Sequence, residues 1–210
     1  MAGILSGSSI LYAIESGDIE IDPFNSSQVN PASYDLTLGS GVAVYKEWVS
    51  WDDRADELHK MGVRGPRDGS DLTPMRDRVF DVKTEPEVLE WTIDQERGWV
   101  LKPGVCYLMH THERICTKKY VPILDGKSSI GRLFLKVHEC AGFGDPGYDG
   151  QYTLEVTVQH PLRVYSGMRI CQIRFHTIDG QVESYQKKGS YKGALAKGPV
   201  PSQAWRMFLK

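Results

Sequence analysis

Residues 126 to 156 concentrate polar and charged side chains in the stretch GKSSIGRLFLKVHECAGFGDPGYDGQYTLEV. It contains paired serines, cationic residues, aspartates and glutamates, and two glycine-rich turns interrupt it. Cations and hydroxyl groups bind anions, and a carboxylate in a cavity can act as a general acid or base. The composition of this stretch therefore indicates groups gathered to hold a polar ligand.

Glu155 is the candidate for proton transfer. It belongs to the segment GQYTLEVTV, in which polar and apolar side chains alternate. Alternation is typical of a strand with two different faces, and it places Glu155 in the middle of the polar face with Gln151, Thr153 and Thr157. If this face meets solvent, Glu155 is an ordinary exposed strand residue. If the face borders a cavity, Glu155 is a candidate general acid/base.

The segment SSIGRL predicts a short helix that begins at Ser128 or Ser129. A serine can cap such a helix, and the free backbone N–H groups of the first turn can bind an anion. Arg132 follows Ser128 by four residues and shares its helical face, and Lys127 adds a second cation. The segment lacks the glycine spacing of a P-loop. An ordinary N-cap and an anion site therefore both remain open.

The segment DPGYDG, residues 145 to 150, predicts a tight turn. Pro146 presets its own φ, and Gly147 can adopt a positive φ without a steric penalty. Such a turn can present Asp145 to a sugar hydroxyl and Tyr148 to a ring. The alternative is a structural turn whose polar groups are incidental.

Cys106, His110, His112 and Cys116 share strand parity and resemble a metal quartet. At about 3.3 Å per residue, however, an extended chain from 106 to 116 spans roughly 33 Å. One zinc ion cannot join the two ends, so only the histidines could chelate together, and a hydrogen-bonded histidine pair is the alternative. The H-x-E and P-C-x-x-C signature of zinc deaminases is absent, as is a G-x-S-x-G elbow. The sequence predicts no catalytic zinc.

The elements that must position these groups are mostly strands. Alternating segments predict strands at 34 to 38, 41 to 46, 98 to 101, 105 to 109, 151 to 158 and 168 to 175. Turns rich in proline and glycine separate them, which favours an antiparallel β barrel or sandwich with a few short helices. One helix is predicted near the start, capped by Ser8 or Ser9 and ended by Gly17.

Composition bounds the class of protein. The chain has 210 residues, 40% of them hydrophobic and 25% charged, which fits a single domain over residues 1–210. A net charge of −2 gives no general attraction for nucleic acid or an anionic membrane. No membrane span or signal peptide is recognisable, and the 4 cysteines form no CxxC pair, so we expect a reduced, cytoplasmic protein.

Two segments stand apart from the strand pattern. Residues 52–82 are charged and weakly periodic, and they predict a surface insertion, either a solvated loop or an arm that contacts a partner. Residues 187–210 have too little apolar content for an independent fold. They form either a mobile tail or a lid that becomes ordered over a ligand.

Several motifs together resemble the dCTP deaminase family, within the dUTPase-like superfamily. They occur in one order over most of the chain: ILS, AIESGDIEIDPF, NPASYDLTLG, LKPG, T-x-E (Thr111 and Glu113), GKSSIGRL, VHECAGFGDPGYDGQYTLEV and YSGMRICQI. The resemblance implies a homotrimer of distorted β barrels with active sites at subunit interfaces. It implies deamination of dCTP to dUTP and ammonia without zinc, with Mg²⁺ bound through the substrate triphosphate, and it makes dTTP a candidate feedback inhibitor.

The resemblance also implies residue roles for the reaction centre. Glu155 would activate the attacking water and deliver protons to the base. Ser128 and the backbone carbonyl of Ala141 would position that water, and Arg132 would support the site electrostatically.

Other residues would hold the nucleotide. The phosphates would contact Lys127, Ser128, Ser129 and the adjoining Ile130, Gly131 and Arg132. Asp145 would bind the deoxyribose 3′-hydroxyl beside Tyr148. Thr153, Leu154 and Glu155 would line the base, and the remaining contacts would come from Gln172 and Tyr185.

Some residues depart from the family pattern. Cys140 stands where threonine is frequent, Gly131 where alanine is usual, and the tail SYKGALAKGPVPSQAW differs from the usual arrangement. The sequence AGF at 141 to 143 resembles bifunctional members that also cleave dUTP to dUMP and pyrophosphate. A dUTP diphosphatase without deaminase activity and a catalytically silent nucleotide-binding module are the alternatives.

Overall fold

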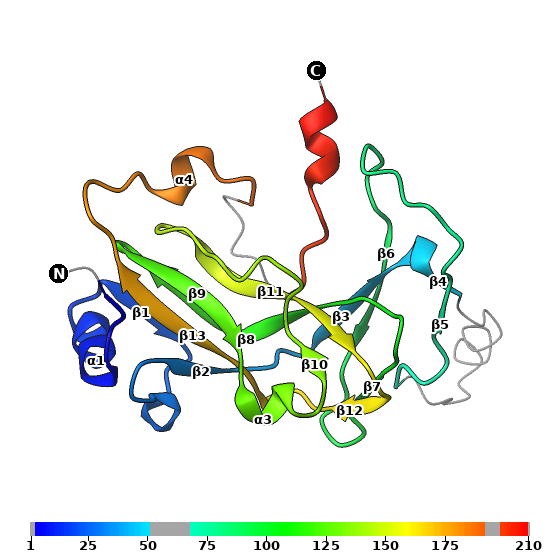
Figure 1. Cartoon of the computed structure of the whole chain (residues 1–210), viewed down its shortest axis with the longest axis horizontal. Coiled ribbons are helices and arrows are strands. Elements are labelled where there is room, and N and C mark those ends of the chain that lie inside the picture. The colour runs from blue at the N-terminus through cyan, green and yellow to red at the C-terminus, as the bar shows by residue number, and fades with distance from the viewer. Residues whose placement is uncertain (1–2, 51–67, 192–197, 210) are drawn as a thin grey trace.

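The computed structural model describes residues 3–50, 68–191 and 198–209. This part of the chain is built mainly from antiparallel strands, with a few short helices at its edges (Figure 1). The predicted mainly-β class is therefore confirmed. Residues 51–67 and 192–197 lie outside the described part, so much of the predicted insertion and part of the predicted lid do too.

The largest sheet has six strands in the order β10-β11-β8-β3-β6, and β1 also pairs with β8. The bounds are β1 Ile19–Asp22, β3 Gly41–Tyr45, β6 Val88–Thr92, β8 Tyr107–Thr117, β10 Leu135–Lys136 and β11 Asp149–Val158. The pairing of β11 with β8 sets Glu155 opposite Leu108. The strand that carries the candidate acid/base is thus held on one side by the longest strand of the fold.

Three smaller sheets complete the strand framework. One has the order β2-β13-β9, and β12 pairs with β7 and β4 with β5. Their bounds are β2 Tyr34–Thr37, β4 Val49–Ser50, β5 Thr73–Pro74, β7 Trp99–Leu101, β9 Tyr120–Gly126, β12 Leu162–Val164 and β13 Arg169–Thr177. The expected barrel is not closed, because the described strands form four separately hydrogen-bonded sheets.

The helices are short and lie at the periphery. They are α1 Gly7–Glu15, η1 Ser26–Gln28, η2 Lys46–Trp48, α3 Ser128–Gly131, α4 Tyr185–Lys188 and η3 Ala204–Phe208. The side chain of Ser6 caps α1 by accepting from the N–H of Ser9, so the prediction of Ser8 or Ser9 as the cap is wrong. Gly17 follows the helix with a φ of 70°, as predicted for its end.

The core lies between the sheets and contains the apolar side of each predicted alternation. Trp99, Tyr107, Leu154 and Phe175 are all fully buried. Leu72, from the described part of the predicted insertion, is buried with them. Residues 68 to 82 are therefore not a solvated loop throughout, because Leu72 packs into the core.

Buried polar residues tie β2 to β8 and explain the T-x-E motif. Glu113 is 1% exposed, and its carboxylate accepts from the side chain of Gln28 at 3.1 Å and from both the N–H and the hydroxyl of Thr37 at 2.9 and 2.8 Å. The hydroxyl of Thr111 donates to the Glu113 carbonyl and accepts from the N–H of Tyr152. Buried polar groups need such partners. These motif residues therefore hold strands together.

His110 is hydrogen-bonded on both ring nitrogens. Nε2 accepts from the N–H of Gly41 at 2.9 Å, and Nδ1 lies 2.8 Å from the carbonyl of Thr111, to which it must donate. Both bonds form together only in the neutral ring with its proton on Nδ1. A Cβ on Gly39 would lie 2.0 Å from the same ring. His110 thus belongs to the packing of the sheet, and its geometry favours a hydrogen-bonded histidine over a metal ligand.

We expect acid to destabilise the protein in part through His110. Burial lowers the pKa of His110 in the folded protein, whereas the unfolded chain has a histidine pKa near 6.5. The unfolded state therefore binds the proton first, and the free energy of unfolding should decrease as the pH falls through about 6.5. Urea denaturation of the wild type and of His110→Gln between pH 5 and pH 8 measures this. An equally steep pH dependence in the variant would contradict the assignment.

Candidate functional site

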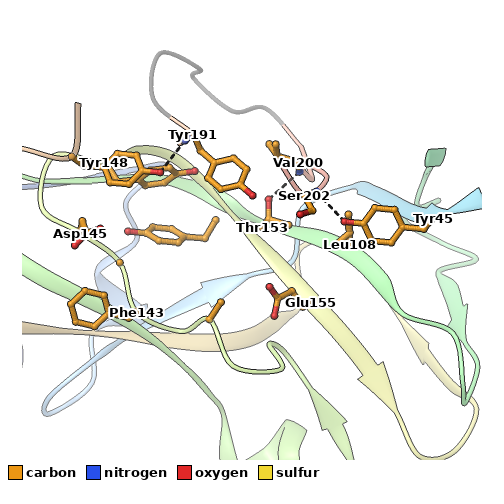
Figure 2. A pocket seen from close by; sticks show the side chains of 14 residues that line it. Tyr45, Leu108, Phe143, Asp145, Tyr148, Thr153, Glu155, Tyr191, Val200 and Ser202 are labelled. Carbon is orange, nitrogen blue, oxygen red and sulfur yellow. Dashed lines mark hydrogen bonds between the residues drawn. The ribbon is translucent and has the colours of Figure 1, made fainter. Parts of the chain in front are cut away.

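A cavity of about 370 Å³ lies against β11 and β8. Figure 2 shows side chains from distant parts of the sequence around it. It is lined by Tyr45, Leu108, Ala141, Phe143, Gly144, Asp145, Tyr148, Tyr152, Thr153, Glu155, Tyr185, Tyr191, Val200 and Ser202. A concave, largely aromatic cavity with a few polar groups is the usual form of a small-molecule site.

Glu155 reaches this cavity from the polar face of β11. Figure 2 shows its carboxylate directed away from the strand, on the side where Thr153 also lies. Its Oε2 accepts a hydrogen bond of 3.1 Å from the main-chain N–H of Glu139. Of the two interpretations that the sequence left open, the geometry favours the cavity-facing one. Glu155 is thus placed to exchange a proton with a bound ligand.

Tyrosines form one wall of the cavity. The ring centroid of Tyr148 lies 4.9 Å from that of Tyr152 and 5.6 Å from that of Tyr185. Burial raises the pKa of Tyr148 to about 12 and also raises that of Tyr152. These phenols therefore stay neutral at physiological pH. They supply flat apolar surface with polar edges, which suits an aromatic ring.

A bulge in β11 brings Tyr152 into this wall. The register with β8 shifts between Gln151 and Thr153. Tyr152 and Thr153 therefore both line the cavity, although strict alternation assigns them to opposite faces. The displaced N–H of Tyr152 finds its partner in the hydroxyl of Thr111 at 2.9 Å. Sequence alternation did not reveal this change, and so missed Tyr152.

The turn DPGYDG forms as predicted and closes another side. Gly147 has a φ of 88°, which favours glycine, and its N–H donates to the carbonyl of Thr117 at 2.6 Å. A Cβ at Gly147 would lie 2.2 Å from the hydroxyl of Ser184. The N–H of Tyr185 in turn donates to the carbonyl of Pro146 at 2.8 Å. This packing sets Tyr185 against the turn.

The described end of the tail lies over the cavity. The N–H groups of Gly198, Val200 and Ser202 donate to Gln151 Oε1, Thr153 Oγ1 and the Tyr45 hydroxyl at 2.8, 3.0 and 3.0 Å. Burial raises the pKa of Tyr45. Figure 2 shows Val200 and Ser202 beside Thr153. Beyond them, η3 projects away from the sheets (Figure 1).

The predicted phosphate-binding residues lie in a second, more open depression of about 580 Å³. It is lined by Asn30, Pro31, Ala32, Ser33, Lys127, Ser128, Ser129, Arg132 and Gln172. The short helix predicted there forms, but no serine side chain caps it, and Lys127 occupies the N-cap position. The serine hydroxyls are therefore not used as helix caps.

A buried carboxylate lies under this depression. Asp35 is fully buried and accepts from Lys127 Nζ at 2.9 and 2.7 Å, from Arg169 Nη1 at 3.3 Å and from Asn30 Nδ2 at 2.8 Å. Gln172 is held nearby, since its amide donates to the carbonyl of Gly126 at 3.0 Å. Removing one member of a buried charge pair typically costs about 3–5 kcal/mol. Asp35 thus fixes the lysine that precedes α3.

The predicted site residues therefore fall into two groups on one chain. Ala141, Asp145, Tyr148, Thr153, Glu155 and Tyr185 line the first cavity, and Lys127, Ser128, Ser129, Arg132 and Gln172 line the second depression. The two share no lining residue. Leu154 and Ile130 are buried in the core, and Gly131 is exposed at the end of α3.

Sequence reasoning did not name several residues that line the first cavity. These are Tyr45, Leu108, Phe143, Gly144, Tyr152, Tyr191, Val200 and Ser202. Phe143 belongs to the AGF segment and Gly144 follows it directly, so that segment could have marked both. The others come from strands and from the tail, which only long-range contacts bring together. In the described ranges, no group of three or more histidine, cysteine, aspartate or glutamate side chains is arranged to hold a metal ion. Among the same residues no helix is both long and apolar enough to cross a membrane.

Comparison with known proteins identifies relatives of the whole chain. A protein named dCTP deaminase, dUMP-forming, from Leptospira biflexa is 39% identical over 207 residues, which is 99% of this chain and 99% of that protein. One of the same name from Clostridium acetobutylicum is 38% identical over 206 residues, 98% of this chain and 99% of its own.

A solved structure shares the fold. The crystal structure of 2′-deoxycytidine 5′-triphosphate deaminase from Agrobacterium tumefaciens superposes with a TM-score of 0.56 at 21% identity. The match covers 90% of this chain but 54% of that one. The sequence model for dCTP deaminase-like proteins matches residues 4–178. The chain therefore belongs to the dCTP deaminase-like family.

Proposed function

We propose that this protein is an enzyme that deaminates dCTP and then cleaves the triphosphate, so that dCTP and two waters give dUMP, pyrophosphate and ammonia. The observation that carries the proposal is the Glu155 carboxylate facing an aromatic cavity of about 370 Å³. The names of the full-length relatives support both steps, since they specify a deaminase that forms dUMP. The AGF segment supports the second step as well.

Glu155 carries the proton transfers of the deamination. It removes a proton from water as the oxygen attacks cytosine C4, and it delivers that proton to the ring nitrogen N3. The second proton of the same oxygen then passes through the carboxylate to the amino group, which leaves as ammonia. One carboxylate can perform these transfers in sequence because its proton is returned at each stage. The hydroxyl of Ser128 and the carbonyl of Ala141 position the water in this proposal, and Arg132 stabilises the developing charge.

A second copy of the chain completes the site. Glu155 and the tyrosine wall lie in one cavity, whereas Lys127, Ser128, Ser129 and Arg132 line a separate depression of the same chain. A nucleotide that must touch both sets does so most simply across an interface, with the base in one copy and the phosphates on its neighbour. A closed ring of such head-to-tail contacts is a cyclic oligomer, here a homotrimer. Mg²⁺ enters with the substrate triphosphate.

The decisive experiment follows ammonia and pyrophosphate together. The purified protein is incubated with dCTP and, separately, with dUTP in the presence of Mg²⁺. Ammonia, pyrophosphate and dUMP from dCTP are the expected products. Ammonia with accumulating dUTP would show that the protein deaminates dCTP but does not cleave the triphosphate. Pyrophosphate from dUTP, without ammonia from dCTP, would indicate a dUTP diphosphatase. If neither ammonia nor pyrophosphate is released, the protein is a nucleotide-binding module without catalytic activity. Adding dTTP to the same assay tests feedback inhibition.

We propose that the tail is a lid on this site. A protein that ends at residue 197 loses the three main-chain donors that hold the segment over the cavity, and each hydrogen bond contributes about 1 kcal/mol. We expect the KM for dCTP to rise by about tenfold or more, with a smaller fall in kcat. Steady-state kinetics measures both constants. Met207→Ala changes an exposed residue of η3 and keeps all three donors, so it is the matched control and should behave as the wild type. An unchanged KM in the truncated protein would refute the lid.

A further inference from the structure

The loop between β10 and the DPGYDG turn passes directly beside Glu155. This loop comprises residues 137 to 144, and its C-terminal end is fixed to β9 through backbone hydrogen bonds. The N–H of Leu124 donates to the carbonyl of Gly142 at 2.7 Å, and the N–H of Gly144 donates to that of Pro122 at 2.9 Å. A Cβ at Gly142 would lie 2.6 Å from the Leu124 carbonyl oxygen. This end of the loop is therefore tightly packed.

The other end of the loop is fixed through the side chain of Glu139. Its Oε1 accepts from the hydroxyl of Thr157 at 2.7 Å, and its Oε2 lies 3.3 Å from Lys136 Nζ. The hydrogen bond from Thr157 is the main cause that lowers the pKa of Glu139, so the carboxylate is ionised at neutral pH. Thr157 lies two residues after Glu155 in β11. The strand that carries Glu155 thus also holds the loop beside it.

This attachment directs the main-chain N–H of Glu139 at the catalytic candidate. That N–H donates to Glu155 Oε2 at 3.1 Å. Within the described part of the chain, no other hydrogen bond reaches the Glu155 carboxylate, so Oε1 stays available to water or substrate. The terminal torsion of a glutamate is otherwise broad. One fixed donor therefore selects the orientation of both oxygens.

We propose that Glu139 is a positioning residue for the reaction, held by Thr157 and Lys136 so that its backbone N–H orients Glu155. The inference rests on the proposed function, since it assigns Glu155 the proton transfers. Three other titratable groups surround this point. Tyr45 on β3 interacts electrostatically with Glu155, Cys106 immediately before β8 interacts with Glu139, and His138 lies in the loop.

Thr157→Val tests the proposal, because it removes the hydroxyl and keeps the shape of a β-branched strand residue. We expect kcat for ammonia release to fall about fivefold to tenfold, as for loss of one typical hydrogen bond, with KM changed less than about twofold. Thr157→Ser keeps the donor and should restore wild-type values. Glu139→Ala removes the same attachment at a half-exposed loop position and serves if Thr157→Val does not fold.

A measurement without turnover separates this inference from the proposed function. The amide ¹⁵N–¹H signal of Glu139 should follow the ionisation of Glu155 in a pH titration by NMR, and it should stop doing so in Glu155→Gln. In Thr157→Val this response should weaken. A wild-type protein that releases no ammonia would refute the proposed function while the titration still tests the contact. Unchanged kcat and amide titration in both variants, with only thermal stability altered, would overturn the positioning role.

Discussion

Glu155→Gln should abolish ammonia release from dCTP while leaving nucleotide binding nearly intact. Glutamine has the size of glutamate and keeps an oxygen for the N–H of Glu139, but it cannot accept and return a proton. General acid/base groups contribute about 10²–10⁴-fold, and here one group performs several transfers, so we expect a loss of about a thousandfold or more. Ammonia release under saturating dCTP measures the loss, and calorimetry measures the dissociation constant.

The matched control is Glu90→Gln, which makes the same chemical change on an exposed position of β6. It should retain wild-type activity. Pyrophosphate release from dUTP should also survive in Glu155→Gln, because phosphate cleavage does not need a proton delivered to the base. Retained ammonia release in Glu155→Gln would show that another group activates the water. Loss of dCTP binding would show instead that Glu155 holds the base.

Mixing two inactive proteins should restore activity if the site is shared between copies. Glu155→Gln is defective in the first cavity and Arg132→Ala in the second depression, and we expect each alone to be inactive. In a mixed oligomer, some interfaces combine the intact Glu155 of one copy with the intact Arg132 of the next. Random assembly at equal amounts gives such interfaces a frequency of about one quarter, so activity should return to about a quarter of wild type.

The two proteins can be coexpressed with different tags and the mixed oligomers purified through both. Every mixed trimer has one intact interface of its three, so the purified sample should show about a third of wild-type activity. Double mutants carrying both changes on one chain, coexpressed with the wild type, provide the control for assembly. Light scattering gives the number of copies and should report a trimer. A monomer that is active, or mixed oligomers without activity, would place the complete site within one chain and refute the shared arrangement.

Much of the strand framework could be predicted from local pattern. The segments around Leu36, Trp99 and Leu154 alternate because one face of each strand enters the core, and this requirement is visible in a single sequence. Gly147 was predictable for a similar reason, since the DPGYDG turn needs a positive φ there. Glu155 could be singled out because it is a carboxylate in the middle of the polar face of a strand.

Features that depend on long-range contacts could not be predicted. The bulge between Gln151 and Thr153 relies on the hydroxyl of Thr111, which is 41 residues from Tyr152 in the chain, and the alternation of the sequence does not indicate it. The cap of α1 was misplaced because three serines lie close together and only the geometry selects Ser6. The prediction of a closed barrel was wrong, because the strand segments of a sequence do not show which strand edges pair.

The way the tail is attached has a consequence for how its sequence can vary. Its segment GPVPS donates from alternate residues, and the residues between the donors, Pro199 and Pro201, have no N–H to leave unpaired. Prolines also reduce the freedom that the segment loses when it settles on the body. Because the backbone makes these bonds, side chains of the tail can diverge among relatives at little cost to attachment. The constraint falls instead on the three side-chain oxygens that accept these hydrogen bonds, which belong to Gln151, Thr153 and Tyr45.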